Sequence, residues 1–395
     1  MATSALAAVA ISVATASAGV GPATPAGAAP AKNQASAMTS AIQKVMRQNS
    51  IPGAIVGVWQ KGAAPYVKAF GVRNKATGQP MAANLHMRIG SETKTFTVTA
   101  LLQLVDQKKV GLDDPISKYV SGVPDGDAIT LRELAEMRSG LMSYTASDTW
   151  GQQFVADPER QWTPQELLPY SFSQPLLFVP GTNFNYSNTN TVLLGLVVEK
   201  ASGQTLSTYI TQHILKPEHL GHTVFPDSAA FPSLHAQGYT NQTADGQVAN
   251  STGWNPSWGW AAGAMISTLS DLRTWAKDVA TGTLLTPATQ RQREKFIPVP
   301  AMAPATYGLA LFDINGWIGH NGSLPGYQSL TVYLPAQQTT MVVLLNTDIN
   351  PPNQELSTLI GRAITTVITP RHIFYFSSAV QTSPSTTTTS APSAP

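Results

Sequence analysis

The stretch GSETKTFTVTALLQLVDQKK, residues 90–109, decides how the rest of the chain is interpreted. Its apolar residues recur at the spacing of one helix face: Phe96, Ala100, Leu101, Leu104 and Val105. Lys108 and Lys109 suit the negative C-terminal end of a helix, and Gly111 is a typical stop signal. The stretch therefore predicts a helix that opens at Gly90 and ends near Lys109.

Ser91 and Lys94 stand at the start of this helix, three residues apart and hence on one face. A serine hydroxyl becomes a good nucleophile when a neighbouring base takes its proton, and a desolvated lysine can be neutral enough to do so. The helix N-terminus adds N–H donors where an oxyanion would form. A capping serine followed by a solvated lysine gives the same pattern, so the motif alone leaves both interpretations open.

Two further motifs contain side chains that could take part in catalysis or substrate binding. Tyr186 and Asn188 lie in a Gly/Pro/Asn-rich stretch before a helical pattern at residues 191–200, and a loop can aim both side chains into a cleft. His320, Gly322 and Ser323 precede the turn at residues 324–326, where a glycine lets a substrate approach an edge strand. Taken singly, each motif fits an ordinary turn equally well.

The patterns on either side predict the architecture. Strands are expected at residues 54–59, 66–72, 261–267, 307–312, 330–334 and 340–345, with a hairpin connection at 335–338. Helices are expected at residues 37–48 and 355–368. The fold class is therefore α/β of the α+β type: an antiparallel sheet flanked by N- and C-terminal helices, with an inserted all-α region. The α/β parts cover about 37–112 and 255–376, and the helical insertion about 113–254.

Composition excludes several classes of protein. The 395 residues carry 24 basic and 22 acidic side chains with no basic cluster, so nucleic acid is not an expected partner. The absence of cysteine excludes thiolate metal sites and a cysteine nucleophile. His213, His219 and His222 lack the His-Glu-x-x-His spacing, so neither a metal nor another cofactor is predicted. No Gly-x-Ser-x-Gly elbow and no P-loop lysine motif occurs.

The two ends of the chain differ from the middle. Residues 1–36 have no charge before residue 32, a short apolar run at 6–13 and small residues after it, which is typical of an export signal. The positive start of such a signal is missing, so a disordered leader on a cytoplasmic protein is the alternative. Residues 377–395 are rich in Ser, Thr and Pro and predict a disordered tail. No apolar stretch is long enough to predict a stable membrane span.

Taken together and in this order, Ser91-x-x-Lys94, Tyr186-x-Asn188 and His320-x-Gly322 resemble the penicillin-recognising serine hydrolases. That family comprises D-alanyl-D-alanine peptidases, class C β-lactamases and related esterases. Residues 112–119, 129–132, 139–141, 262–263 and 267–268 fit it as well, so the resemblance covers roughly 37–370. It implies a β-lactamase/transpeptidase-like fold.

The resemblance also implies roles. Ser91 is expected to be the acylated nucleophile, and Lys94 and Tyr186 the proton-transfer pair, either of which could be the base. Asn188 is expected to bond the substrate amide. His320, where most relatives have lysine, is expected to support Tyr186 and the substrate.

The same resemblance assigns the substrate-binding surface. The backbone N–H groups of Ser91 and Ser323 are expected to form an oxyanion hole, with Gly322 beside it. Trp258 and Trp260 are expected to line the cleft, which would suit the apolar acyl group of an esterase substrate.

The resemblance favours an acyl-enzyme serine hydrolase of amide or ester bonds. Histidine in the third motif is most similar to the D-alanyl-D-alanine carboxypeptidase branch, which binds penicillin. That branch tends to carry an arginine before the third motif, and none lies between Arg293 and His320. A class C-like β-lactamase, an esterase or a noncatalytic binding protein on the same fold are the alternatives. The expected ligands are small molecules or peptidoglycan peptides, with β-lactams as acylating agents. The protein is expected to be secreted or held in the cell envelope.

Overall fold

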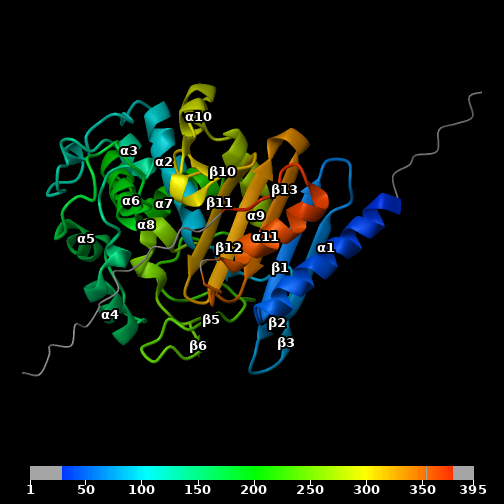
Figure 1. Ribbon diagram of the computed structural model, residues 1–395. Coiled ribbons are helices and arrows are strands. Elements are labelled where there is room, and N and C mark those ends of the chain that lie inside the picture. The colour runs from blue at the N-terminus through cyan, green and yellow to red at the C-terminus, as the bar shows by residue number, and fades with distance from the viewer. Residues whose placement is uncertain (1–28, 353, 377–395) are drawn as a thin grey trace, which may run out of the picture.

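A nine-stranded antiparallel sheet forms the centre of the molecule (Figure 1). The computed structural model describes residues 29–352 and 354–376. Within them the strand order is β3-β2-β1-β13-β12-β11-β10-β9-β8. The strands are β1 (Gly53–Gln60), β2 (Tyr66–Asn74), β3 (Gln79–Pro80), β8 (Ile297–Pro298), β9 (Thr306–Tyr307), β10 (Phe312–Ile314), β11 (Trp317–Leu324), β12 (Tyr327–Leu334) and β13 (Thr339–Leu345). Strands from both ends of the sequence therefore meet at the β1–β13 pair.

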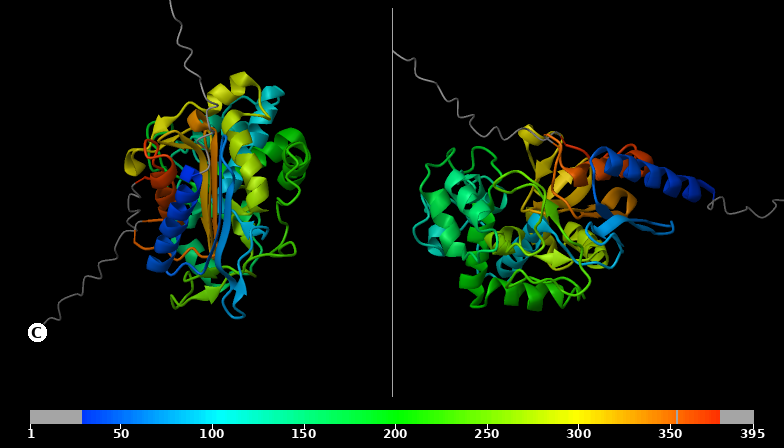
Figure 2. Two further views of the ribbon diagram at one scale, coloured as in Figure 1. Left: turned by 90° about the vertical axis from the view of Figure 1, so that its right-hand side faces the viewer. Right: turned by 90° about the horizontal axis from the view of Figure 1, so that it is seen from below.

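The two terminal helices cover one face of this sheet. Helices α1 (Ala29–Gln48) and α11 (Leu356–Ile368) lie side by side there (Figures 1 and 2). Their buried apolar residues, such as Ile42 and Ile360, join one core cluster with alternate residues of the central strands. Helix α1 begins at Ala29, earlier than the predicted start at residue 37, because the Ala-rich stretch before it also favours helix.

The other face carries the helical part of the molecule (Figure 2). Helices α2 (Thr93–Asp106) and α9 (Leu269–Thr281) belong to a second core cluster there, and α9 packs against β12 and β13. The remaining helices are α3 (Leu131–Ala135), α4 (Asp148–Ala156), α5 (Pro164–Phe172), α6 (Asn188–Ser202), α7 (Leu206–Ile210), α8 (Trp260–Gly263) and α10 (Pro287–Arg293). Short strand pairs join β4 (Met87–Arg88) to β7 (Ile266–Ser267) and β5 (Tyr239–Thr240) to β6 (Ala249–Asn250). The predicted fold class is confirmed.

Two predicted strands are wrong in part. Only Ile266–Ser267 of the stretch 261–267 is extended, while Trp260–Gly263 forms α8. Small residues allow this tight turn, since a Cβ atom on Gly195 of α6 would lie 2.7 Å from the Ala261 Cβ atom. The stretch 307–312 is broken between β9 and β10 by a turn in which Ala310 has a φ of 56°.

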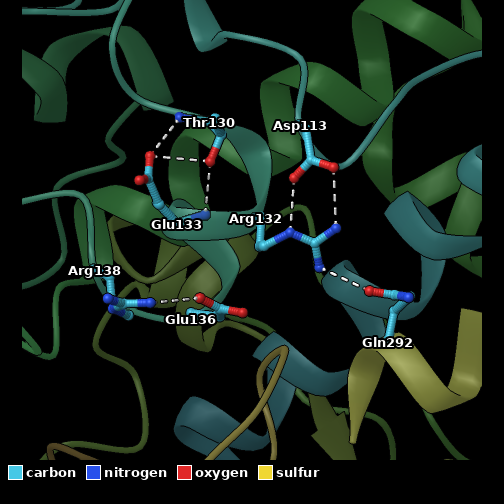
Figure 3. Close-up of polar contacts among 7 residues, drawn as sticks. All are labelled: Asp113, Thr130, Arg132, Glu133, Glu136, Arg138 and Gln292. Atoms are coloured by element: carbon cyan, nitrogen blue, oxygen red, sulfur yellow. Dashed lines mark hydrogen bonds and ion pairs between the residues drawn. The ribbon is translucent and has the colours of Figure 1, made fainter. Parts of the chain in front are cut away.

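Polar contacts hold α3 in place (Figure 3), and the chain just after α3 binds the loop that carries Tyr186. Thr130 and Glu133 form a capping box at the start of α3, and Arg132 binds both carboxylate oxygens of Asp113. The backbone after α3 then fastens the loop, because Met137 accepts a hydrogen bond from the Asn185 N–H group at 2.9 Å. The helical region therefore fixes where Tyr186 enters the site.

The predicted leader and tail are largely untested. Residues 1–28 and 377–395 lie outside the described structure, so export and a disordered tail stay predictions. Among the residues that are described, no helix combines the length and apolarity that crossing a membrane requires.

Candidate active site

Ser91 lies in a tight turn at the point where the chain leaves the sheet layer and enters α2. A 3-10 turn, Gly90–Glu92, leads directly into Thr93 of that helix. Gly90 has a φ of 53°, which glycine adopts without steric cost. A Cβ atom there would also lie 2.6 Å from the Ser323 backbone nitrogen. Glycine therefore lets the turn and strand β11 approach each other at the nucleophile.

Lys94 is buried completely behind Ser91. Its Nζ atom lies 3.0 Å from Ser91 Oγ, 2.7 Å from Asn188 Oδ1 and 2.8 Å from the Ala262 carbonyl oxygen. Burial lowers the pKa of Lys94 well below its usual value, which favours the neutral amine. A neutral amine has two N–H donors, which satisfy Asn188 and Ala262, and one lone pair, which remains for the Ser91 hydroxyl proton. The arrangement suits a general base.

Tyr186 borders the same hydroxyl from the loop before α6. Its own hydroxyl is buried and makes no hydrogen bond within the described residues; burial raises the tyrosine pKa, and the neighbouring Ser91 lowers it by less. The Lys94 Nζ atom lies 4.9 Å from the centre of the tyrosine ring. Tyr186 is therefore protonated at neutral pH and able to donate its proton to an atom bound at Ser91.

Strand β11 presents an open edge to Ser91. Its pairing with β10 ends at Gly319, so the edge from His320 to Leu324 has no strand neighbour on that side. Gly322 packs so close that a Cβ atom would meet the Ile89 carbonyl oxygen at 1.9 Å. The Ser323 backbone nitrogen lies beside the turn that holds Ser91, and the oxyanion hole expected from these two N–H groups stays a prediction.

His320 lies inside β11 and is buried, not in a surface turn. Its Nδ1 atom contacts the Asn321 carbonyl oxygen, which can only accept, so Nδ1 carries the proton. Its Nε2 atom then accepts from the Tyr307 hydroxyl at 3.3 Å. Burial and the nearby Lys94 lower the pKa of His320 to about 3. The ring centre is 6.1 Å from that of Tyr186, so the imidazole supports Tyr186 by packing and makes no hydrogen bond to it.

A cavity of about 310 Å³ opens beside Ser91. It is lined by Ser91, Tyr186, Met302, Phe312, Asn321, Gly322, Ser323, Glu355 and Phe376. Asn188 lies behind it, where the amide oxygen holds Lys94 and the amide nitrogen donates to Thr145 Oγ1 at 3.1 Å. In the described part of the chain, no group of three or more histidines and carboxylates is placed to hold a metal ion.

Trp258 and Trp260 do not line this cavity, contrary to expectation. Trp258 lies in an aromatic cluster with Trp150 and Phe154, at ring-centre distances of 5.5 and 5.4 Å. Trp260 packs on α6, where a Cβ atom on Gly195 would lie 2.7 Å from its ring. Both indoles instead bury apolar surface within the helical region.

Three site residues had no signal in the sequence: Tyr307, Glu92 and Glu355. Tyr307 was hidden in an apolar strand pattern. Glu92 looks like an ordinary acidic residue of a first helical turn, yet burial raises its pKa to about 8, partly offset by Ser329 and Thr331. Glu355 lies 264 positions from Ser91 in the numbering, and only the fold brings it to the cavity.

Comparisons with known proteins agree with this geometry. Residues 38–364 match the Beta-lactamase family. Protein flp of Staphylococcus aureus (strain MW2) is 26% identical over 314 residues, which cover 77% of this chain and 61% of flp. This chain thus spans less than two thirds of the length of that relative.

Solved structures of similar fold cover more of both chains. A D-stereospecific amidohydrolase from Streptomyces sp. superimposes with a TM-score of 0.73 at 30% identity, covering 80% of this chain and 94% of the other. D-amino acid amidase from Ochrobactrum anthropi SV3, complexed with L-phenylalanine amide, gives 0.72 at 25% identity, covering 84% and 98%.

A sheet between terminal helices and a helical insertion, with serine and lysine at the head of α2, defines a protein of the β-lactamase/transpeptidase-like fold. The chain belongs to the Beta-lactamase family.

Proposed function

We propose that this protein hydrolyses small amide or ester substrates through an acyl-enzyme on Ser91. The observation that carries the proposal is the Lys94 amine, buried and held by two acceptors so that its lone pair is directed at Ser91 Oγ. Such an amine takes the serine proton as the oxygen attacks the substrate carbonyl. The backbone N–H groups of Ser91 and Ser323 then stabilise the oxyanion.

Departure of the leaving group and hydrolysis of the acyl-enzyme use the same side chains. Tyr186 gives its proton to the departing amine or alcohol and regains one from Lys94, so the pair returns to its starting state. Water then attacks the ester at Ser91, and the neutral Lys94 amine accepts the proton of the water. Lys94 returns that proton to Ser91 Oγ as the acyl group leaves as a carboxylic acid. Asn188 Oδ1 holds the Lys94 amine throughout.

The finer proposal is an amidase whose acyl part has the D configuration. Two structural neighbours are a D-stereospecific amidohydrolase and a D-amino acid amidase, which supports this substrate class. D-alanyl-D-alanine carboxypeptidase activity with penicillin binding, predicted from His320, is the second candidate. The contacts of His320 give it less support, because a neutral, buried imidazole cannot bind a terminal carboxylate as a cation would.

The discriminating experiment measures steady-state rates on four substrates side by side. They are D-phenylalanine amide, an N-acylated D-alanyl-D-alanine, nitrocefin and a short p-nitrophenyl ester. We expect the highest kcat/KM on the amide among the three amide-type substrates, and the L-enantiomer as a matched control to be slower. Faster release of D-alanine from the dipeptide would instead support the carboxypeptidase. No turnover of any of the four by folded protein would contradict a hydrolase.

A further inference from the structure

The cavity beside Ser91 contains one carboxylate, Glu355, at the point where α11 begins. Its Oε2 atom accepts a hydrogen bond from Asn321 Nδ2, and its side chain makes no capping bond to the helix. None of the four ion pairs formed by the described residues includes it. Glu355 is therefore a largely enclosed carboxylate with one neutral partner and no cation.

The same cavity is also lined by aromatic side chains. The rings of Phe312 and Phe376 lie nearly parallel, with an angle of 9° and 6.3 Å between their centres, and Met302 is a further apolar lining residue. Aromatic faces and a carboxylate both attract a cation, whereas both disfavour an anion. Burial raises the pKa of Glu355, as expected for a carboxylate that lacks a positive partner.

The position of the cavity indicates which part of a substrate it receives. Tyr186 lines it, but Asn188 does not. In the mechanism proposed above, Tyr186 protonates the departing group, so the departing group lies next to the Tyr186 hydroxyl. The space between Tyr186 and Glu355 is therefore the place of the leaving group.

We propose that Glu355, together with the Phe312 and Phe376 rings, selects substrates whose leaving group carries a positive charge, an ammonium or quaternary ammonium. This inference rests on the proposed acyl-enzyme function and names the charge class of its substrate. This charge preference is opposite to that of a carboxypeptidase, whose leaving group is an amino acid with a carboxylate.

Three acetyl thioesters of similar length test this charge preference. Their leaving thiols are thiocholine, its neutral carbon isostere and mercaptopropionate, and thiol release is followed by colour. We expect kcat/KM to fall by about tenfold from the cationic to the neutral ester, the size of one charge-assisted contact, and to fall again for the anionic ester. Glu355→Gln should remove the first difference, Glu355→Asp should keep part of it, and Glu355→Lys should favour the anionic ester.

The matched control is Glu159→Gln, which removes one negative charge from an exposed side chain away from the cavity and should leave the order of the three esters unchanged. Thermal melting checks that each variant is folded. Equal rates on the three esters, or an unchanged preference in Glu355→Gln, would overturn the inference while labelling of Ser91 by a fluorophosphonate keeps the proposed function intact. Failure of that labelling would overturn both.

Discussion

The role of base proposed for Lys94 depends on the surroundings of the amine as well as on its position in the sequence. The Ser91-x-x-Lys94 spacing placed both residues on one helix face, and the structure adds Asn188 and the Ala262 carbonyl as partners of the amine. Those partners come from 94 and 168 positions away, so no local pattern reveals them. What the sequence could predict was the reacting pair. What it could not predict was the environment that keeps the lysine neutral.

Lys94 and Tyr186 are expected to act as one proton-transfer unit, and their substitutions should be non-additive. Lys94→Ala, Tyr186→Phe and the double variant should fall to similar residual rates of acylation by a p-nitrophenyl ester. Stopped-flow measurement of the first turnover gives these rates. If the two single losses multiply in the double variant, the residues work independently and the shared mechanism is wrong.

His320 is expected to stay neutral throughout the working range, because its pKa lies near 3. Between pH 5 and 8 acylation should therefore hold or rise, with no descending limb from an imidazolium. His320→Gln should keep the shape of the profile. NMR of the histidine ring protons provides the direct measurement of its protonation. A decline between pH 6 and 7 that disappears in His320→Gln would show that the charged ring is required.

The elements differ in how well local patterns anticipated them. Helix α2 and strands β1, β2, β12 and β13 were predicted within three residues of their actual bounds, but no strand was predicted at β11, which carries His320. Helix α8 and the break between β9 and β10 were missed, because they depend on tertiary contacts such as that of Ala261 with α6. The assignment of Trp258 and Trp260 to the cleft failed because a sequence pattern does not show in which direction a side chain points.

Gly322 sets the spacing between β11 and the turn of Ser91. In Gly322→Ala the new Cβ atom would lie 1.9 Å from the Ile89 carbonyl oxygen, which is too close for the strand to keep its place. The strand must move away, and the Ser323 N–H group moves with it. We expect kcat to fall about 100-fold or more, as for loss of one oxyanion donor. Gly151→Ala, which adds a methyl group in open space, is the matched control and should keep full activity.

A Gly322→Ala variant that is as active as the wild type would show that the Ser323 N–H group does not contact the oxyanion. Circular dichroism and thermal melting separate this local effect from loss of the fold.

Glu92 is expected to make stability depend on pH. Its pKa is about 8 in the folded protein, above the usual value of 4.5, because the carboxyl group is buried under β12. The folded state therefore holds a proton that the unfolded state has lost, so the free energy of unfolding falls as pH rises from about 4.5 to 8. Glu92→Gln removes this loss, and its advantage in Tm over the wild type should grow between pH 5 and 8. A difference in Tm that is constant with pH would mean that Glu92 is ionised.

The whole molecule brings three motifs, separated by about a hundred residues each, to one cavity between the sheet and the helical region. Their order in the chain was enough to predict the fold class, because the resemblance specified an arrangement. The charge of the cavity was not predictable, since Glu355 and Phe376 come from the far C-terminal end of the described chain and belong to none of the motifs. The charge preference that we propose for the substrate therefore depends on residues that only the tertiary structure brings to the cavity.

Trapping the acyl-enzyme shows directly whether Ser91 is the nucleophile. The protein is mixed with a fluorescent penicillin or a fluorophosphonate, quenched in acid, digested and analysed by mass spectrometry. We expect one adduct, on Ser91, which is absent in Ser91→Ala. That variant should melt within a few degrees of the wild type, since a helix-start serine contributes only about 1 kcal/mol. An adduct on another residue, or one that persists in Ser91→Ala, would contradict the assignment of Ser91 as the nucleophile.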